Sequence, residues 1–242
     1  MIRFDHVSCA YEKGRTVLRD LSFSLEKGEA VGLVGANGAG KSTLMKALLG
    51  LMPYEGEITV DGLKVEERNL REIRRKLGFV LQNSDNQMFM PTVAEDMLFG
   101  PLNYGMKREE AEKTVDEVLL SLGITELKGR HNHRISGGEK RMAAIATVLA
   151  MKPEVLLMDE PSSALDPWNR RMVIRTINAL PVTRLIASHD LDLILDTCGR
   201  VLLLSGGRLA ADGPAEEILT DRALLEKHRL ELPLRFGGEN PR

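Results

Sequence analysis

The chain has 242 residues, of which 43% are hydrophobic and 28% are charged, a composition typical of a globular protein. We find no internal repeat and no linker, so the length predicts a single domain spanning residues 1–242. The formal net charge of −2 supplies no field that would favour nucleic acid, and we therefore expect no nucleic-acid partner.

Residues 1–30 are typical of strands rather than of a targeting segment. The stretch from Met1 to His6 lacks the apolar core of a signal peptide. Leu21–Leu25 alternates strictly between apolar and polar residues, which predicts a half-buried strand in an antiparallel sheet. Tyr11 lies in the polar stretch before that strand. It is either a surface aromatic or a residue that stacks on a nucleotide base.

A short apolar run ends at Gly35 in a glycine-rich turn, and residues 35–42 fit the phosphate-loop pattern G-x-x-x-x-G-K-[ST] at every fixed position. Glycines let the backbone curl so that N–H groups point at phosphate oxygens, and the following helix N-terminus adds partial positive charge. Lys41 is expected to reach the β- and γ-phosphates, and Ser42 to supply an oxygen to Mg²⁺. The alternative is a glycine-rich turn that binds no ligand.

The next segments predict a short strand and a basic helix. Gly56–Gly62 is typical of a strand closed by an Asp-Gly turn. Residues 69–76 carry several arginines on one helical face, which is either a solvated face or a binding surface. Leu77–Leu81 then predicts a strand that ends at Gln82, at the kind of strand end where α/β folds place ligand contacts.

A helical region without strands follows. Thr92–Glu95 matches a capping box that opens a short helix, which we expect to stop near Gly100–Pro101. Residues 107–122 predict an amphipathic helix with Gly123 as its C-terminal stop. We therefore expect a helical insert at about residues 92–150, attached to the nucleotide-binding core.

Ser136 is a good N-cap for the apolar helix that runs to Met151, and Gly137 and Gly138 at the helix start would leave N–H groups accessible to an anion. An ordinary helix cap is the alternative. Val155–Glu160 predicts a buried strand that ends in two carboxylates. We expect Asp159 to hold Mg²⁺ through water and Glu160 to polarise an attacking water, the alternative being a helix cap or a surface position.

Asp166 and Pro167 predict the start of a helix that runs to about Leu180. Residues 184–187 predict another core strand, which ends beside His189. A single histidine is more often structural, but a histidine at the end of a core strand downstream of an Asp-Glu pair is placed to sense the γ-phosphate. Residues 201–211 predict a closing hairpin, two short helical segments follow, and the tail at 237–242 is expected to fray.

The order of these segments resembles the nucleotide-binding domain of ABC transporters over nearly the whole chain. The matching segments are the Walker A loop at Gly35–Thr43, the Q-loop glutamine at Gln82, the signature at Ile135–Glu139, Walker B with the catalytic glutamate at Val155–Glu160, the D-loop at Ser163–Asp166 and the switch histidine at His189. The resemblance implies an α/β fold of the P-loop NTPase class, with a RecA-like core, an antiparallel β subdomain and a helical insert.

The resemblance also implies the residues of an ATP site. Catalytic roles fall on Glu160, His189, Lys41 and Gln82, and Mg²⁺ ligation falls on Ser42, Gln82 and Asp159. ATP contacts fall on Tyr11, Gly35, Asn37, Gly38, Ala39, Gly40, Lys41, Ser42 and Thr43, and, from the signature, on Ser136, Gly137, Gly138 and Glu139.

The signature departs from the family's usual Leu-Ser-Gly-Gly-Gln by having Ile135 and Glu139. The isoleucine keeps volume and apolarity. Glu139 suits the helix dipole but adds negative charge close to a nucleotide. Residues 78–87, with Pro91-Thr92-Val93 and Leu230-Glu231-Leu232-Pro233, look like the ATPases of cobalt/nickel and energy-coupling-factor uptake systems.

The resemblance implies a head-to-tail dimer, of two identical chains or of two relatives, in which ATP lies between Walker A of one subunit and the signature of the other. It implies further partners: a polytopic transmembrane coupling subunit and a substrate-binding membrane subunit, with this chain peripheral on the cytoplasmic side of the cell membrane. Two other interpretations stay open: an ABC ATPase that acts on nucleic acid or ribosomes, and a weakly active regulatory subunit, which Glu139 alone suggests.

Overall fold

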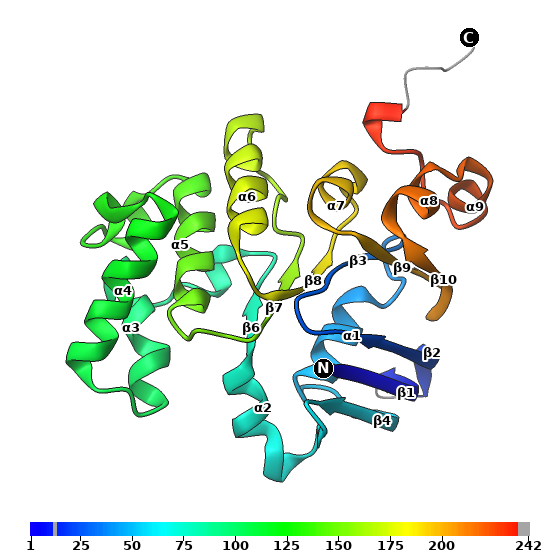
Figure 1. The fold of residues 1–242 in the computed structure, drawn as a ribbon, viewed down its shortest axis with the longest axis horizontal. Coiled ribbons are helices and arrows are strands. Elements are labelled where there is room, and N and C mark those ends of the chain that lie inside the picture. The colour runs from blue at the N-terminus through cyan, green and yellow to red at the C-terminus, as the bar shows by residue number, and fades with distance from the viewer. Residues whose placement is uncertain (12–13, 237–242) are drawn as a thin grey trace. The chain divides into compact units, whose positions relative to one another are not determined.

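A computed structural model describes residues 1–11 and 14–236, which divide into two compact units (Figure 1). One unit comprises Met1–Arg74 together with Pro181–Arg242, and the other comprises Arg75–Leu180. The predicted tail at 237–242 lies outside the described residues. Within the described ranges, no helix has both the length and the apolar character needed to cross a lipid bilayer.

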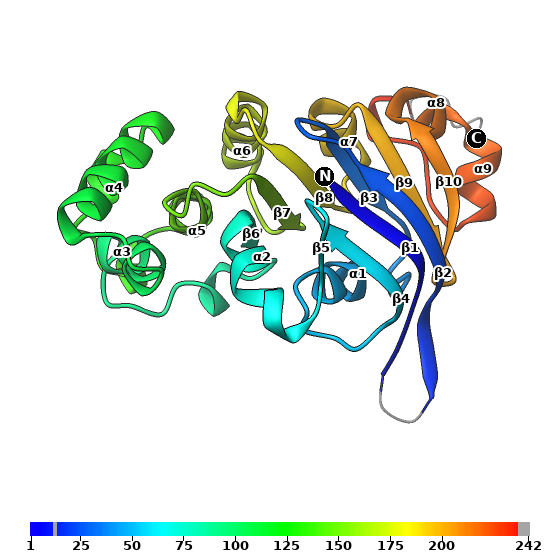
Figure 2. The ribbon, with the colours of Figure 1, turned by 60° about the horizontal axis from the view of Figure 1, so that its bottom comes forward.

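The first unit contains an antiparallel sheet with the strand order β2-β1-β4-β5 (Figure 2). Its strands are β1 (Ile2–Tyr11), β2 (Arg15–Leu25), β4 (Glu55–Val60) and β5 (Leu63–Lys64). The predicted alternation in β2 is confirmed, because Leu21, Phe23 and Leu25 are buried while Ser22 is exposed. The predicted Asp-Gly turn joins β4 to β5. These strands form the antiparallel β subdomain that the sequence led us to expect.

The same unit contains parallel strands that carry part of the expected site. Strand β3 (Ala30–Val34) pairs in parallel with β8 (Thr183–Ala187) and with β9 (Arg200–Ser205), and β10 (Arg208–Pro214) pairs with β9 in the predicted hairpin. The helices α1 (Lys41–Leu48), α7 (Leu191–Thr197), α8 (Ala215–Thr220) and α9 (Arg222–Lys227) and the turn η5 (Leu234–Phe236) complete the unit. The side chains of β3 other than glycine are fully buried after its first residue, which makes this strand the centre of the core.

The second unit contains two parallel strands, β6 (Leu77–Val80) and β7 (Val155–Asp159), with helices between and after them. The helices are α3 (Val93–Asn103), α4 (Arg108–Leu122), α5 (Gly137–Leu149) and α6 (Pro167–Ala179), and α3, α4 and α5 pack against one another (Figure 1). Helix α2 (Leu70–Lys76) contains the sequence boundary between the units. Residues 81–154, all of which are described, form helices and 3-10 turns, with a single β-bridge between Thr92 and His131.

Local signals predicted most helix ends correctly, with one exception. Thr92 and Glu95 form the expected capping box, and Gly123 ends α4 with a left-handed φ of 67°. Helix α3, however, does not stop near Gly100–Pro101 but runs to Asn103. Pro101 lies in the last turn, where its missing N–H removes only one helical hydrogen bond, and its buried ring fills space in the core.

Cys9 and Cys198 are both buried and free. Burial raises the pKa of each thiol from 9.0 to about 11, so both remain protonated at neutral pH and pack as small apolar groups. Among the described residues there is no cluster of His, Cys, Asp and Glu that would hold a metal ion on its own.

Candidate functional site

The phosphate loop between β3 and α1 requires its glycines. Gly35, Gly38 and Gly40 have φ values of 155°, 78° and 110°, in the region that other residues rarely adopt. A Cβ atom on Gly35 would lie 2.4 Å from the backbone oxygen of Leu204, and one on Gly40 would lie 2.5 Å from Cδ2 of Leu18. The curled backbone that the motif predicts is therefore present: the φ values disfavour side chains at all three positions, and at Gly35 and Gly40 a side chain would also be crowded.

Lys41 begins α1 and folds back over this loop. Its ammonium Nζ donates to the carbonyl oxygen of Gly35 at 2.6 Å and lies 3.5 Å from that of Ala36, and the residue is only 8% exposed. The phosphate loop and the first turn of α1 thus combine a positive charge, a helix N-terminus and two hydroxyl residues, Ser42 and Thr43. This donor set fits a polyphosphate, which is recognised by N–H groups and a cation.

Tyr11 contacts the same helix. Its hydroxyl lies 3.2 Å from Oγ1 of Thr43, and the residue is 45% exposed. The end of β1 is therefore tied to the residues that follow the phosphate loop. The stacking of this ring on a nucleotide base remains a prediction. The contact with Thr43 holds the Tyr11 side chain beside the helix that follows the phosphate loop.

His189 leaves the first unit's parallel sheet at the same edge as the phosphate loop. In the register of β3 and β8, Leu33 faces Ala187, and the N–H of Ser188 donates to the carbonyl of Leu33 at 3.3 Å. The loop begins two residues after Leu33 and His189 follows two residues after Ala187, so both extend from neighbouring strand ends. The histidine is exposed.

The second unit also places candidate site residues just after two neighbouring parallel strands. Strands β6 and β7 are parallel with Val80 facing Met158, and Gln82 and Glu160 each lie two residues after these paired positions. Gln82 is exposed, whereas Asp159 and Glu160 are 8% and 6% exposed. Glu160 has a left-handed φ of 49°, which is uncommon for a side chain of this kind and often marks a functional position. The carboxylate of Asp159 and the hydroxyl of Ser42 are oxygen donors of the type that Mg²⁺ prefers.

The signature segment forms a complete capping box at the start of α5. The N–H of Ser136 donates to the Glu139 carboxylate at 2.7 Å, and the N–H of Glu139 donates to the Ser136 hydroxyl at 3.3 Å. The hydrogen bond from the backbone N–H of Ser136 lowers the pKa of the Glu139 carboxyl most of all, and a hydrogen bond from the Ser136 side chain lowers it further. Sequence reasoning assigned Glu139 to the helix dipole and to the ATP contacts but missed the capping box, although Ser-x-x-Glu is its recognised signal. Gly138 is also constrained, since a Cβ there would lie 2.2 Å from Cγ of Asn169 in α6.

Because glutamine closes a capping box as well as glutamate does, Glu139→Gln should leave the thermal stability of the protein nearly unchanged. Glu139→Ala removes the acceptor for the Ser136 N–H and should lower the free energy of unfolding by about 0.5–1 kcal/mol. Circular dichroism during thermal unfolding should show this as a loss of about 1–4 °C. An alanine variant that unfolds at the wild-type temperature would contradict the capping role.

Arg141 is a site residue that sequence reasoning missed. It lies in the N-terminal part of α5, directly before the apolar residues, is 3% exposed, and donates from Nη1 to the carbonyl of Leu81 at 2.7 Å and from Nη2 to the carbonyl of Gln82. Gln87 adds to this connection by accepting from the N–H of Leu81 at 2.9 Å and donating to the carbonyl of Ala144 at 2.6 Å. The segment that carries Gln82 is therefore fastened to the signature helix.

The expected residues thus fall into two groups, each held within one unit. The first unit groups the phosphate loop, Tyr11 and His189, and the second groups Gln82, Asp159, Glu160 and the capped signature helix.

Comparisons with known proteins agree with this description. The ABC transporter family model matches residues 18–163, more than half of the chain. A Streptomyces coelicolor relative is 47% identical over 234 residues, covering 96% of this chain and 90% of that protein. The energy-coupling factor transporter ATP-binding protein EcfA of Methanothermobacter thermautotrophicus is 42% identical over 96% of this chain and 77% of its own. The solved structure of cbiO1 from Clostridium perfringens, described as part of the ABC transporter complex cbiONQ, superposes with a TM-score of 0.84 at 31% identity, covering 93% of each chain.

Proposed function

Because the chain belongs to the ABC transporter family as an ATP-binding subunit, we propose that it hydrolyses ATP to power a membrane importer of the energy-coupling-factor or cobalt/nickel type. The likeness to EcfA and to cbiO1 supports the importer class. The transported solute is not part of the proposal, since its recognition would belong to a separate membrane subunit.

The observation that carries the proposal is the position of the Lys41 ammonium, which lies inside a loop whose backbone conformation depends on its glycines. In the proposal, this loop binds the phosphates of the substrate ATP through its N–H groups, and Lys41 exchanges its bond to the Gly35 carbonyl for the β- and γ-phosphates. Asn37, Ala39 and Thr43 are the neighbouring contacts, and Tyr11 stacks on the base.

Hydrolysis requires a group that orients water and groups that balance the developing charge. We assign the first role to Glu160, a buried carboxylate that directly follows β7, and the second to Lys41 and His189. Ser42, Gln82 and Asp159 would hold Mg²⁺, which when bound neutralises phosphate charge. Gln82 would also transmit whether nucleotide is bound, through the segment that Arg141 joins to α5 by hydrogen bonds.

A second copy of this chain, or a close relative, would supply the other side of the nucleotide. In the proposal, the N-terminus of α5 at Ser136–Glu139 meets the γ-phosphate bound by the partner's phosphate loop, so that ATP holds the two subunits together. Hydrolysis removes that bridge and the dimer opens.

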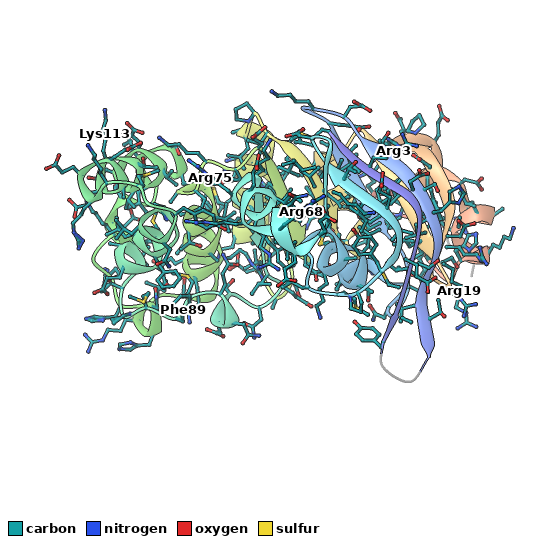
Figure 3. All side chains as sticks on the ribbon, turned by 90° about the horizontal axis from the view of Figure 1, so that it is seen from below. Arg3, Arg19, Arg68, Arg75, Phe89 and Lys113 are labelled. Atoms are coloured by element: carbon teal, nitrogen blue, oxygen red, sulfur yellow. The ribbon has the colours of Figure 1, made fainter. Side chains whose placement is uncertain are left out.

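An exposed aromatic pair marks the surface that we assign to the membrane partner. Phe89 is 63% exposed and Phe99 45% exposed, and their rings meet edge to face with centroids 4.9 Å apart. Phe89, labelled in Figure 3, extends from the loop ahead of α3. Exposed apolar patches of this kind often mark interaction sites. The pair supports docking to a membrane-embedded partner. In the proposal the chain lies peripherally on the cytoplasmic side of the membrane, where Gln82 and the helices would transmit movement to a polytopic subunit.

Affinity purification of the tagged chain from detergent-solubilised membranes of its own cells tests the proposal. We expect a polytopic membrane protein and a small substrate-binding membrane protein to copurify. Phe89→Asp combined with Phe99→Asp should reduce their recovery severalfold while ATP binding stays unchanged, and Leu120→Asp, another exposed apolar position, serves as the control. ATPase activity stimulated by DNA or by ribosomes, without membrane partners, would contradict it.

A further inference from the structure

The last described segment of the chain is fastened to helix α7 by one arginine. The Arg235 side chain donates to the carboxylate of Asp192 at 2.6 Å, to the carboxylate of Asp196 at 2.6 Å and to the backbone oxygen of Asp192 at 3.1 Å. The backbone N–H groups of Leu234 and Arg235 also donate to Asp192, at 2.7 and 3.3 Å. We call these four residues the Arg235 clamp.

Helix α7 has little stability of its own. It has seven residues, fewer than a helix needs to be stable alone in water. Asp192 and Asp196 lie four positions apart, on one face, where like charges repel. Asp196 also lies at the C-terminal end of the helix, where a negative charge opposes the helix dipole and where no basic residue of the helix itself offsets it. The Arg235 guanidinium offsets both effects because it contacts both carboxylates at once.

The other face of α7 is held by the core. Leu193 and Ile194 are fully buried, and a Cβ on Gly32 of β3 would lie 2.4 Å from Cγ2 of Ile194. The helix is thus placed between the strand that leads into the phosphate loop and the Arg235 clamp. Figure 1 shows α7 beside α8, and the two pack against each other.

The N-terminus of α7 fixes the backbone on either side of His189. Asp190 caps the helix by accepting from the N–H of Leu193 at 2.9 Å, and its own N–H donates to the Ser188 hydroxyl at 3.1 Å. His189 therefore lies between a strand end and a helix cap, only three residues ahead of Asp192. A displacement of α7 would move this backbone.

We propose that Arg235 is a positioning residue for His189: by holding α7 against the core, the Arg235 clamp fixes the backbone from which the imidazole extends. This inference rests on the proposed function, in which His189 acts on the γ-phosphate. Arg235 itself contacts two aspartates and no reacting atom, so its effect falls on the chemical step rather than on ATP binding.

Steady-state ATPase kinetics of the full chain test the proposal. Arg235→Gln should lower kcat roughly tenfold with KM changed less than about twofold, because the variant removes an interaction that matters only in the transition state. The kcat of Arg235→Lys should lie between those of the wild type and Arg235→Gln, since an ammonium does not bridge two carboxylates as a guanidinium does. Arg208→Gln, an exposed arginine of β10, is the matched control and should keep the wild-type kcat.

The double variant Arg235→Gln/His189→Ala tests whether Arg235 acts through His189. If Arg235 acts through His189, Arg235→Gln should lower kcat no further in the His189→Ala background. The same tenfold loss in both backgrounds would overturn the proposal, as would a wild-type kcat for Arg235→Gln when His189→Ala is impaired. A wild-type kcat for His189→Ala would overturn the role of His189 in the proposed function, and this inference with it. If Arg235→Gln fails to fold, Asp196→Asn is the milder variant and should lower kcat in the same direction.

Discussion

Glu160→Gln is expected to lower ATP turnover by a factor of about 10²–10⁴ while leaving ATP binding intact, because glutamine keeps the shape of the side chain but does not accept a proton. Glu160 is 6% exposed and directly follows the fully buried β7, so an isosteric replacement should not disturb the fold. The variant should also accumulate as an ATP-stabilised dimer, since the γ-phosphate that joins the subunits is no longer removed. Phosphate release and size-exclusion chromatography with and without ATP measure the two effects.

Glu154→Gln is the matched control for Glu160→Gln. Glu154 precedes the same strand at its opposite end, is exposed, and pairs with Lys76 at 3.6 Å. An exposed pair of this kind contributes little to stability, so the control should hydrolyse ATP at the wild-type rate. Wild-type turnover in Glu160→Gln itself would remove Glu160 from the catalytic role.

Lys41→Ala should weaken ATP binding by a factor on the order of 100 or more, which corresponds to the loss of charge-assisted hydrogen bonds worth roughly 3 kcal/mol. The physical reason is the position of Nζ, which already lies inside the phosphate loop at 2.6 Å from the Gly35 carbonyl. Isothermal titration calorimetry with MgATP measures the change directly.

Lys46→Ala separates the loss of this contact from a general loss of positive charge. Lys46 lies in the last turn of the same helix and is exposed, so its removal should leave the ATP affinity within about twofold of the wild type, as expected for a screened surface charge. Thermal unfolding of both variants shows whether the loop has kept its structure. Unchanged ATP affinity in a folded Lys41→Ala variant would mean that the loop does not bind phosphate as proposed.

The sequence predicted the elements whose determinants are local. The Thr92 capping box, the Gly123 stop and the Asp166-Pro167 helix start each depend on residues within one turn, and each appears as expected. The phosphate loop is a stronger case of the same kind, because its glycines alone permit the backbone that forms. The position of His189 followed from the rule that ligand contacts gather at strand ends.

The features that the sequence did not predict depend on distant partners. Helix α7 was missed because it has only seven residues with an aspartate near the end, although Asp190 offers an N-cap signal, and its stability comes from contacts with Gly32 and Arg235, both far away in the sequence. Arg141 was missed because its importance lies in the carbonyls of Leu81 and Gln82, which no local pattern connects to α5. The roles of the site residues remain predictions, supported by the family and open to the experiments above.

The capping box of the signature helps to determine which substitutions residues 135–139 tolerate. For the helix cap, position 139 needs an acceptor for the Ser136 N–H, which either glutamine or glutamate supplies. At position 138 any side chain would require the Asn169 side chain to move, since a Cβ there would lie 2.2 Å from its Cγ. Neighbouring residues of one motif therefore differ in the substitutions that we expect them to tolerate. A mutational scan of residues 135–139 should recover both amino acids at 139 and glycine alone at 138.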